Sequence, residues 1–195
     1  MRNRGRTDDG GTTMTDEQTP TQAGAGEVED LRISAFWQAA RGHVGLGKMD
    51  AVMGGTPDDV VPPPSWSYGN GPEAEALLAR VLAGAKTSTA TVLAQLTSAG
   101  LEVPRVGDLS IVTDAAGEPK AVLRTTEVQV VPFDQVSEEH VAAEGAAEAS
   151  HEAWVAEHEA SFTAALGDAF TPASEVVLER FEIIYPTSGP TPAVD

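Results

Sequence analysis

The order of the predicted secondary-structure elements is the feature that most constrains how this chain folds. Helical segments come first, strand-like segments follow, further helical segments come next, and a strand-like segment is last. In chain order these segments are 31–41, 72–84, 108–113, 121–131, 137–144, 150–166 and 176–185. Runs of helices separated from runs of strands are typical of α+β folds, whereas doubly wound parallel sheets alternate the two. The sequence therefore predicts an α+β fold.

Three patterns support these elements. Pro72–Gly84 has an apolar stripe at helical spacing, with Pro72 in the first turn and Gly84 at the end. The segment 176–185 is rich in β-branched residues and alternates in the manner of a strand. The segments 108–113 and 121–131 flank the turn-like sequence Ala-Ala-Gly-Glu-Pro, which predicts a hairpin.

Composition divides the 195-residue chain into one folded region and two tails. Residues 1–30 contain almost no apolar side chains, so they cannot bury enough surface to offset the entropy of ordering. Residues 187–195 carry two prolines among small residues. We therefore expect a single domain at 31–186, between a disordered N-terminal tail at 1–30 and a flexible C-terminal tail at 187–195.

The charge and composition exclude several classes of protein. The chain has 30 acidic and 12 basic residues and a net charge of −18, whereas wrapping a long nucleic acid needs clustered Lys and Arg. No apolar run approaches the length of a membrane span. The chain has no Cys, which removes disulfides, thiolate nucleophiles and Cys-ligated zinc. We expect a cytoplasmic protein that binds neither membranes nor long DNA.

One glycine-rich segment matches part of a phosphate-binding loop. Gly42–Lys48 fits the pattern G-x-x-x-x-G-K, but Met49 stands where a Ser or Thr should hold magnesium. The segment before it has the pattern of an amphipathic helix rather than of the buried strand that the motif requires. We therefore interpret Gly42–Lys48 as a loop.

The histidines do not have the spacing of metal ligands. His151 and His158 are seven residues apart, about 10.5 Å along a helix, which is too far for one ion to bind both directly. His140 and Glu144 are four apart and share a helix face, but no third ligand accompanies them. We expect a solvated or hydrogen-bonded pair there, no metal site and no cofactor.

The residues that follow the helix 72–84 have two interpretations. A lysine such as Lys86 just past a helix C-terminus interacts favourably with the helix dipole, and neighbouring hydroxyls bond the backbone. Lys86 and Thr89 can also form a base and a nucleophile, because a desolvated amine loses its charge readily and can accept a hydroxyl proton. In a regular strand these two side chains face opposite sides, so their cooperation requires a turn or bulge between them.

Short motifs spread along the chain strengthen the second interpretation. They are Trp66-Ser-Tyr68-Gly69-Asn70-Gly-Pro72, Leu82-Ala-Gly84-Ala-Lys86-Thr87-Ser-Thr89, Val106-Gly107-Asp108-Leu109-Ser110, Thr125-Thr126-Glu127-Val128, Val131-Pro132-Phe133-Asp134, Glu144-Gly145, Ser150 with Trp154, His158 and Phe162, and Leu178-Glu179-Arg180-Phe181. In order and spacing they resemble the ASCH (activating-signal-cointegrator homology) domain family. The resemblance covers about residues 66–186.

The resemblance implies a small β-barrel related to the PUA fold, with helices packed around a cleft. Members of the family have been proposed to bind RNA, one branch hydrolyses N4-acetylcytidine to cytidine and acetate, and a few members are described as ribonucleases. The hydrolase branch uses a Lys-x-x-Thr pair and the Glu of a His-x-x-x-Glu segment, which correspond to Lys86, Thr89 and Glu144. Two positions depart from the family pattern: Ala85 is usually basic, and Asn70 is commonly Asp.

On this resemblance we expect hydrolysis of the acetamide of N4-acetylcytidine or a similar small modified nucleoside. Lys86 would take the proton of Thr89, whose oxygen attacks the carbonyl, and Glu144 would donate a proton to the departing amine and then help to activate water. The predicted substrate-binding residues are aromatic side chains for stacking and one residue whose backbone lies near the oxyanion. They are Trp66, Tyr68, Trp154 and Ser88.

Other functions remain open at this stage: a non-catalytic PUA-like module that binds a short RNA or modified nucleotide, a ribonuclease, or a protein-interaction domain. Convergence of Lys86, Thr89 and Glu144 in one cleft would favour the enzyme. A groove lined by several arginines would favour RNA. The candidates for such a groove are Arg80, Arg105, Arg124 and Arg180.

Overall fold

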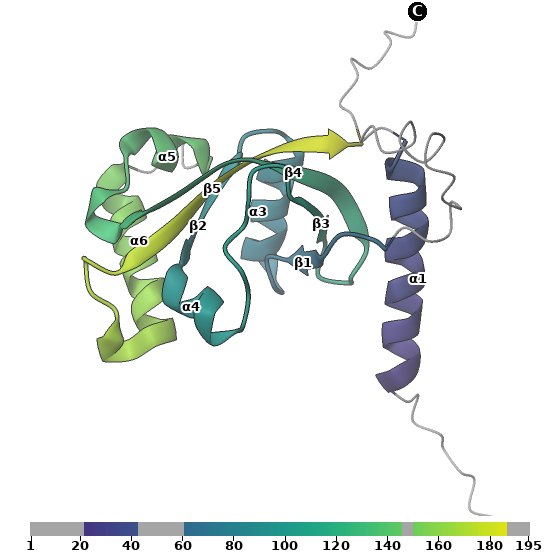
Figure 1. Ribbon diagram of the computed structural model, residues 1–195, viewed down its shortest axis with the longest axis horizontal. Helices are drawn as coiled ribbons and strands as arrows, with labels where there is room; N and C mark the ends of the chain where they lie inside the picture. The colour runs from purple at the N-terminus through teal and green to yellow at the C-terminus, as the bar shows by residue number, and fades with distance from the viewer. Residues whose placement is uncertain (1–21, 43–60, 146–149, 187–195) are drawn as a thin grey trace, which may run out of the picture.

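A five-stranded sheet organises the described part of the chain, residues 22–42, 61–145 and 150–186, in this computed structural model (Figure 1). The strands are β1 (Ser65–Ser67), β2 (Ser88–Val92), β3 (Leu109–Thr113), β4 (Pro119–Pro132) and β5 (Glu175–Tyr185). Their order in the sheet is β1-β3-β4-β5-β2, with β1 parallel to β3 and every other pair antiparallel. This mixed sheet forms a half-barrel, so the predicted α+β, PUA-like architecture is confirmed.

Helices surround the sheet. Within the described residues they are α1 (Gln22–Ala40), α3 (Pro72–Leu82), α4 (Leu93–Ser98), α5 (Glu138–Ala143) and α6 (His151–Leu166), with short 3-10 turns at Phe133–Gln135 and Gly167–Ala169. Every helix and strand that the sequence predicted is present. The sequence patterns missed β1, β2 and α4, which are three to six residues long and too short to show a periodic pattern. No helix in the described ranges has the length and apolarity needed to cross a bilayer.

The N-terminal helix corrects one prediction. We expected a disordered tail through residue 30, but α1 begins at Gln22. Among the described side chains of this helix, from residue 29 onward, Ile33, Trp37 and Ala40 are buried. Once this part of the helix is docked, each further residue adds a hydrogen bond at low cost, so the helix extends into the polar segment. The ends of the chain, residues 1–21 and 187–195, lie outside the described residues. So do residues 43–60, which include most of the Gly42–Lys48 motif.

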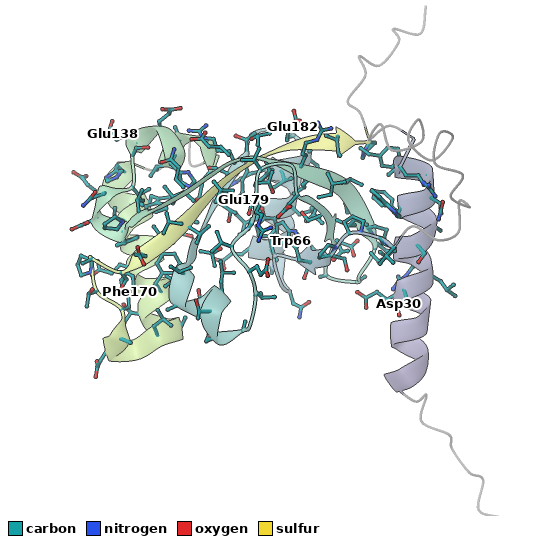
Figure 2. The ribbon with its side chains drawn as sticks, in the orientation of Figure 1. Asp30, Trp66, Glu138, Phe170, Glu179 and Glu182 are labelled. Atoms are coloured by element: carbon teal, nitrogen blue, oxygen red, sulfur yellow. The ribbon has the colours of Figure 1, made fainter. Side chains whose placement is uncertain are left out.

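Two helices cover opposite faces of the sheet. Successive strand residues point to opposite sides, and in β3 the side chain of Ile111 packs with Trp37 of α1, whereas the next side chain, Val112, packs with Val81 of α3. The helix α3 therefore lies on one face near β1 and β3. Acidic side chains such as Glu138 and Glu182 point outward from the fold (Figure 2).

A third apolar cluster joins α5 and α6 to the other end of the sheet. The ring of Phe133, which follows β4, stacks on Trp154 of α6 with centroids 5.8 Å apart and meets Phe162 edge-on at 5.7 Å. Val92 of β2 and Val176 of β5 complete the cluster. This packing holds α6 opposite β2, and the polar residues that precede β2 therefore face the helix.

Candidate active site

A cleft of about 320 Å³ is lined by α3, the start of β2, the end of α5, and α6. Six of its lining side chains could take part in chemistry or in stacking. They are Tyr68, Lys86, Thr89, Glu144, Trp154 and His158.

The end of α3 turns Lys86 into the protein. Gly84 adopts φ +71°, a conformation that favours glycine after a helix, and the N–H groups of Ala85 and Lys86 both donate to the carbonyl of Arg80 at 2.9 and 3.1 Å. As a result the Lys86 side chain is only 4% exposed. It does not act as a solvated cation at the helix end.

Hydrogen bonds between α5 and the start of β2 place Glu144 beside Lys86. Both the N–H and the hydroxyl of Thr87 donate to the carbonyl of Ala143, at 2.7 and 3.3 Å. The Ser88 hydroxyl donates to the carbonyl of His140 at 3.1 Å. The Thr87 contacts satisfy a carbonyl that the end of a helix leaves without a partner, and the Ser88 hydroxyl is a second donor to the His140 carbonyl, which also accepts from the N–H of Glu144. They also fix the last turn of α5 against the residues that carry the lysine.

The residue after Glu144 must be glycine for this approach. Gly145 has φ +76°, and a Cβ atom there would lie 2.7 Å from the carbonyl oxygen of Ala85. Gly84 has a similar φ of +71°, but a Cβ there would have no atom within 4 Å. We expect Gly84→Ala to lower the free energy of unfolding by about 1–2 kcal/mol through backbone strain alone, and Gly145→Ala to lower it further because α5 and the Lys86 segment must separate.

Urea denaturation measures the free energy of unfolding of each glycine variant. Because both variants carry similar backbone strain, the difference between them reports the clash of the new Cβ atom at residue 145. Equal effects would show that the close approach between Gly145 and Ala85 adds nothing to stability.

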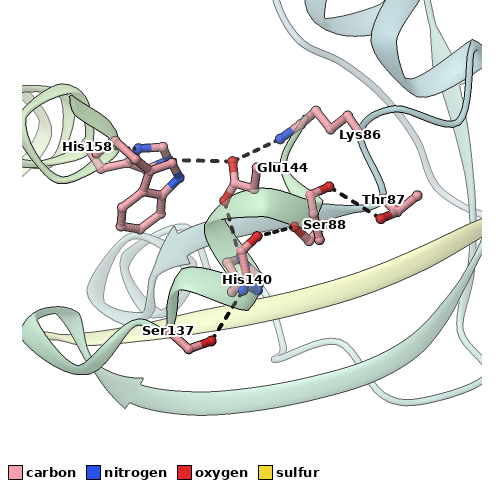
Figure 3. A network of polar contacts seen from close by, with 9 residues as sticks. Lys86, Thr87, Ser88, Ser137, His140, Glu144 and His158 are labelled. Carbon is pink, nitrogen blue, oxygen red and sulfur yellow. Dashed lines mark hydrogen bonds and ion pairs between the residues drawn. The ribbon is translucent and has the colours of Figure 1, made fainter. Parts of the chain in front are cut away.

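Three nitrogen atoms surround the carboxylate of Glu144 (Figure 3). Lys86 Nζ lies 2.9 Å from Oε2, His140 Nε2 lies 3.3 Å from Oε1, and His158 Nε2 lies 3.8 Å from Oε2. Burial would raise the pKa of Glu144, but His140, Lys86 and His158 outweigh it and hold the pKa below its ordinary value. Glu144 is therefore an ionised carboxylate at neutral pH, although its side chain is only 8% exposed.

Tyr68 forms the side of the cleft next to this pair. Burial raises the pKa of its phenol above the ordinary value, and the carboxylate of Glu144 adds to the shift. Lys86 Nζ lies 6.0 Å from the centre of the Tyr68 ring, within the range of a cation–π contact. The Tyr68 hydroxyl is buried and finds no hydrogen-bond partner among the described residues. The phenol is therefore protonated at neutral pH.

The three predicted catalytic residues line the same cleft. Lys86 precedes β2 rather than belonging to it, so the strand alternation that would separate Lys86 from Thr89 does not apply. The hydroxyl of Thr89 has no hydrogen-bond partner in the described ranges, and Lys86 donates to Glu144 instead. The cleft thus holds the hydroxyl of Thr89 and the ion pair of Lys86 with Glu144. No hydrogen bond joins the hydroxyl to either member of the pair.

The predicted substrate-binding residues divide into two groups. Tyr68 and Trp154 line the cleft. Ser88 is fully buried behind it, and Trp66 lies outside its lining, with its ring edge-on to Tyr68 at 4.9 Å and its Nε1 donating to the Ser110 hydroxyl at 3.1 Å. Trp66 therefore supports Tyr68 from behind.

Two histidines at this site were not among the predicted site residues. His158 lies on the stripe it forms with Trp154 and Phe162, a pattern that is typical of a core-facing helix. His140 precedes Glu144 by one helical turn, and the expected pairing of these two is present, but it is buried rather than solvated. The described residues contain no cluster of three or more side chains suited to a metal ion.

The arginines do not form a cationic groove. Three of the four that the RNA hypothesis requires make ion pairs with glutamates: Arg105 with Glu102, Arg124 with Glu182, and Arg180 with Glu127 and Glu139. The fourth, Arg80, is exposed at the cleft.

Comparisons with known proteins agree with this architecture. The structure resembles protein EF3133 from Enterococcus faecalis V583, of the family DUF984, with a TM-score of 0.62 and 28% sequence identity over 78% of this chain and 88% of that chain. It also resembles an ASCH domain from Lactobacillus crispatus JV V101, with a TM-score of 0.58 and 21% identity over 76% of this chain and 98% of the other. No curated protein is significantly similar. A sequence model of the ASCH domain matches residues 64–185, and the chain therefore belongs to the ASCH domain family.

Proposed function

We propose that this protein hydrolyses the acetamide of N4-acetylcytidine or of a similar small modified nucleoside. The observation that carries the proposal is the buried Lys86–Glu144 pair in a cleft that Thr89 also lines. A buried carboxylate with a shifted pKa in a cleft, as Glu144 is here, is typical of functional sites. The sequence resemblance to the hydrolase branch at these same three positions supports the choice of reaction.

The first step needs a base that is neutral when it acts. A threonine hydroxyl is a weak nucleophile until a base takes its proton. Lys86 donates to Glu144 at 2.9 Å, and both side chains are shielded from water. When substrate excludes the remaining water, transfer of a proton from Lys86 to Glu144 removes two buried charges. The neutral amine then accepts the proton of Thr89 as its oxygen attacks the acetyl carbon.

The role of Glu144 is revised by its surroundings. We expected it to begin as a proton donor, but its lowered pKa means that it begins as a carboxylate. It becomes a donor only after it receives the proton of Lys86, which it passes to the departing amine nitrogen. The acetyl group remains on Thr89 and cytidine leaves.

The cleft favours a small neutral substrate. Its volume of about 320 Å³ lies at the lower end of the range for small-molecule sites. The rings of Tyr68 and Trp154 line it and offer surfaces for a flat base. A net charge of −18 and arginines that are paired with glutamates disfavour a long RNA.

Acetate release from N4-acetylcytidine by the purified protein tests the proposal. We expect turnover by the wild type and a loss of about 10²–10⁴-fold in Lys86→Met and in Thr89→Val, because each removes one partner of the proton transfer. Thr91→Val is the matched control, since Thr91 lies on the same strand outside the cleft lining.

A folded wild-type protein that releases no acetate would overturn the proposal. Calorimetric titration with cytidine and short RNAs would then test the non-catalytic binding module.

A further inference from the structure

His158 is a titratable group of the cleft to which the proposed mechanism gives no role. It lies on α6 and approaches the Glu144 carboxylate from the side of that helix (Figure 3). Its side chain is 18% exposed and lines the cleft together with Lys86 and Thr89.

A hydrogen bond defines which nitrogen of His158 carries a proton. Nδ1 lies 3.1 Å from the carbonyl oxygen of Trp154, one turn earlier in α6. A carbonyl only accepts, so Nδ1 must be the donor, and in a neutral imidazole the other nitrogen is then an acceptor. The ring therefore presents the lone pair of Nε2.

The surrounding rings hold His158 in this orientation. Its ring stacks on that of Trp154 with centroids 3.9 Å apart and planes at 21°. The ring of Phe162 meets it edge-on at 5.5 Å. Trp154 and Phe162 are themselves buried in the core, so the imidazole has little freedom to turn.

The charges around the ring favour a neutral imidazole that can accept a proton. Burial lowers the pKa of His158 below its ordinary value, while the carboxylates of Glu144 and Glu157 oppose the shift and Lys86 adds to it. The other titratable groups that line the cleft are Tyr68 and Arg80. Since Glu144 Oε2 lies 3.8 Å from Nε2, an imidazolium that forms during a reaction would be stabilised by a nearby carboxylate.

The gap between Nε2 and Glu144 suits a ligand rather than a direct bond. A neutral Nε2 and a carboxylate oxygen are both acceptors, and 3.8 Å is too long for a hydrogen bond between them. A molecule with an O–H group, such as water, can donate to either atom.

We propose that His158 is the general base of the second half of the reaction, removing a proton from the water that attacks the acetyl group on Thr89. The inference rests on the proposed function. The water oxygen forms a bond to the acetyl carbon as Nε2 takes one proton. The bond between that carbon and the Thr89 oxygen then breaks, and the proton on Nε2 returns to Thr89. Acetic acid leaves and ionises in solvent, and both side chains regain their starting states.

The test compares His158→Gln with His151→Gln, a matched control. His151 lies on the same helix but outside the cleft lining, where Nε2 contacts the Val136 carbonyl at 3.0 Å. In His158→Gln we expect a rapid release of one cytidine per protein, followed by slow turnover. The kcat of this variant should be about 10²–10⁴-fold below that of the wild type. Mass spectrometry should find the acetyl group on Thr89. His151→Gln should turn over like the wild type and show no acetylated protein.

A measurement on the ligand-free wild type tests the inference even if His158→Gln fails to fold. Nitrogen-15 NMR of the histidine rings should show His158 protonated at Nδ1 and neutral at pH 7. A proton on Nε2, or a charged ring at that pH, would overturn the inference. So would turnover by wild type and His158→Gln alike. If the wild type releases neither cytidine nor acetate, the proposed function itself fails and the role of His158 fails with it.

Discussion

Replacing Glu144 by Gln is expected to lower the free energy of unfolding by about 3–5 kcal/mol, because removing one partner of a buried ion pair leaves the other charge uncompensated. The side chains of Lys86 and Glu144 are only 4% and 8% exposed, and their closest atoms are 2.9 Å apart. Water therefore has little access to the charge that remains. Urea denaturation at pH 7 measures the effect.

A double variant separates the interaction energy of Lys86 and Glu144 from the contribution of their surroundings to stability. Lys86→Met combined with Glu144→Gln should be less destabilised than the sum of the two single changes, since neither unpaired charge remains. Glu102→Gln is the control, because the Glu102–Arg105 pair is 85% and 78% exposed and should contribute about 0–1 kcal/mol. A loss in Glu144→Gln no larger than this control would show that the pair is solvated.

The predicted helices and strands followed from periodic patterns, and the elements that the patterns missed are short. The helix 72–84 carries its own start, stripe and stop, and the observed α3 spans Pro72–Leu82. The strand β2 reads Ser-Thr-Ala-Thr-Val, which alternates weakly and becomes a strand because it pairs with β5. Pairing of segments this far apart in sequence cannot be deduced from local periodicity.

The candidate site was predicted as residue types but not as an electrostatic arrangement. The motif resemblance pointed to Lys86, Thr89 and Glu144, and the structure places all three at one cleft. Glu144 is ionised because three side chains from different segments approach its carboxylate. They are His140, Lys86 and His158. This arrangement results from the packing of α5 and α6 against β2, so it could not be deduced from the sequence.

Trp37→Ala is expected to lower the free energy of unfolding by about 3–5 kcal/mol, the usual cost of removing a buried Trp. Trp37 is 2% exposed and packs against Ile111 and Val122, both fully buried. An ion pair between Arg32 and Glu118 joins the same helix to the turn between β3 and β4. The family match begins at residue 64, so α1 lies outside it, yet this helix supplies one side of an apolar cluster of the sheet.

The control for Trp37→Ala is Leu31→Ala on the same helix, because Leu31 is 70% exposed and its loss should leave stability nearly unchanged. A large difference between the two variants would make α1 part of the folding unit and support a single domain that includes it. The chain beginning at residue 61 should then unfold at lower urea, since Ile111 and Val122 lose their cover. If Trp37→Ala behaves like Leu31→Ala, the segment matched by the family is stable alone and the cluster does not depend on α1.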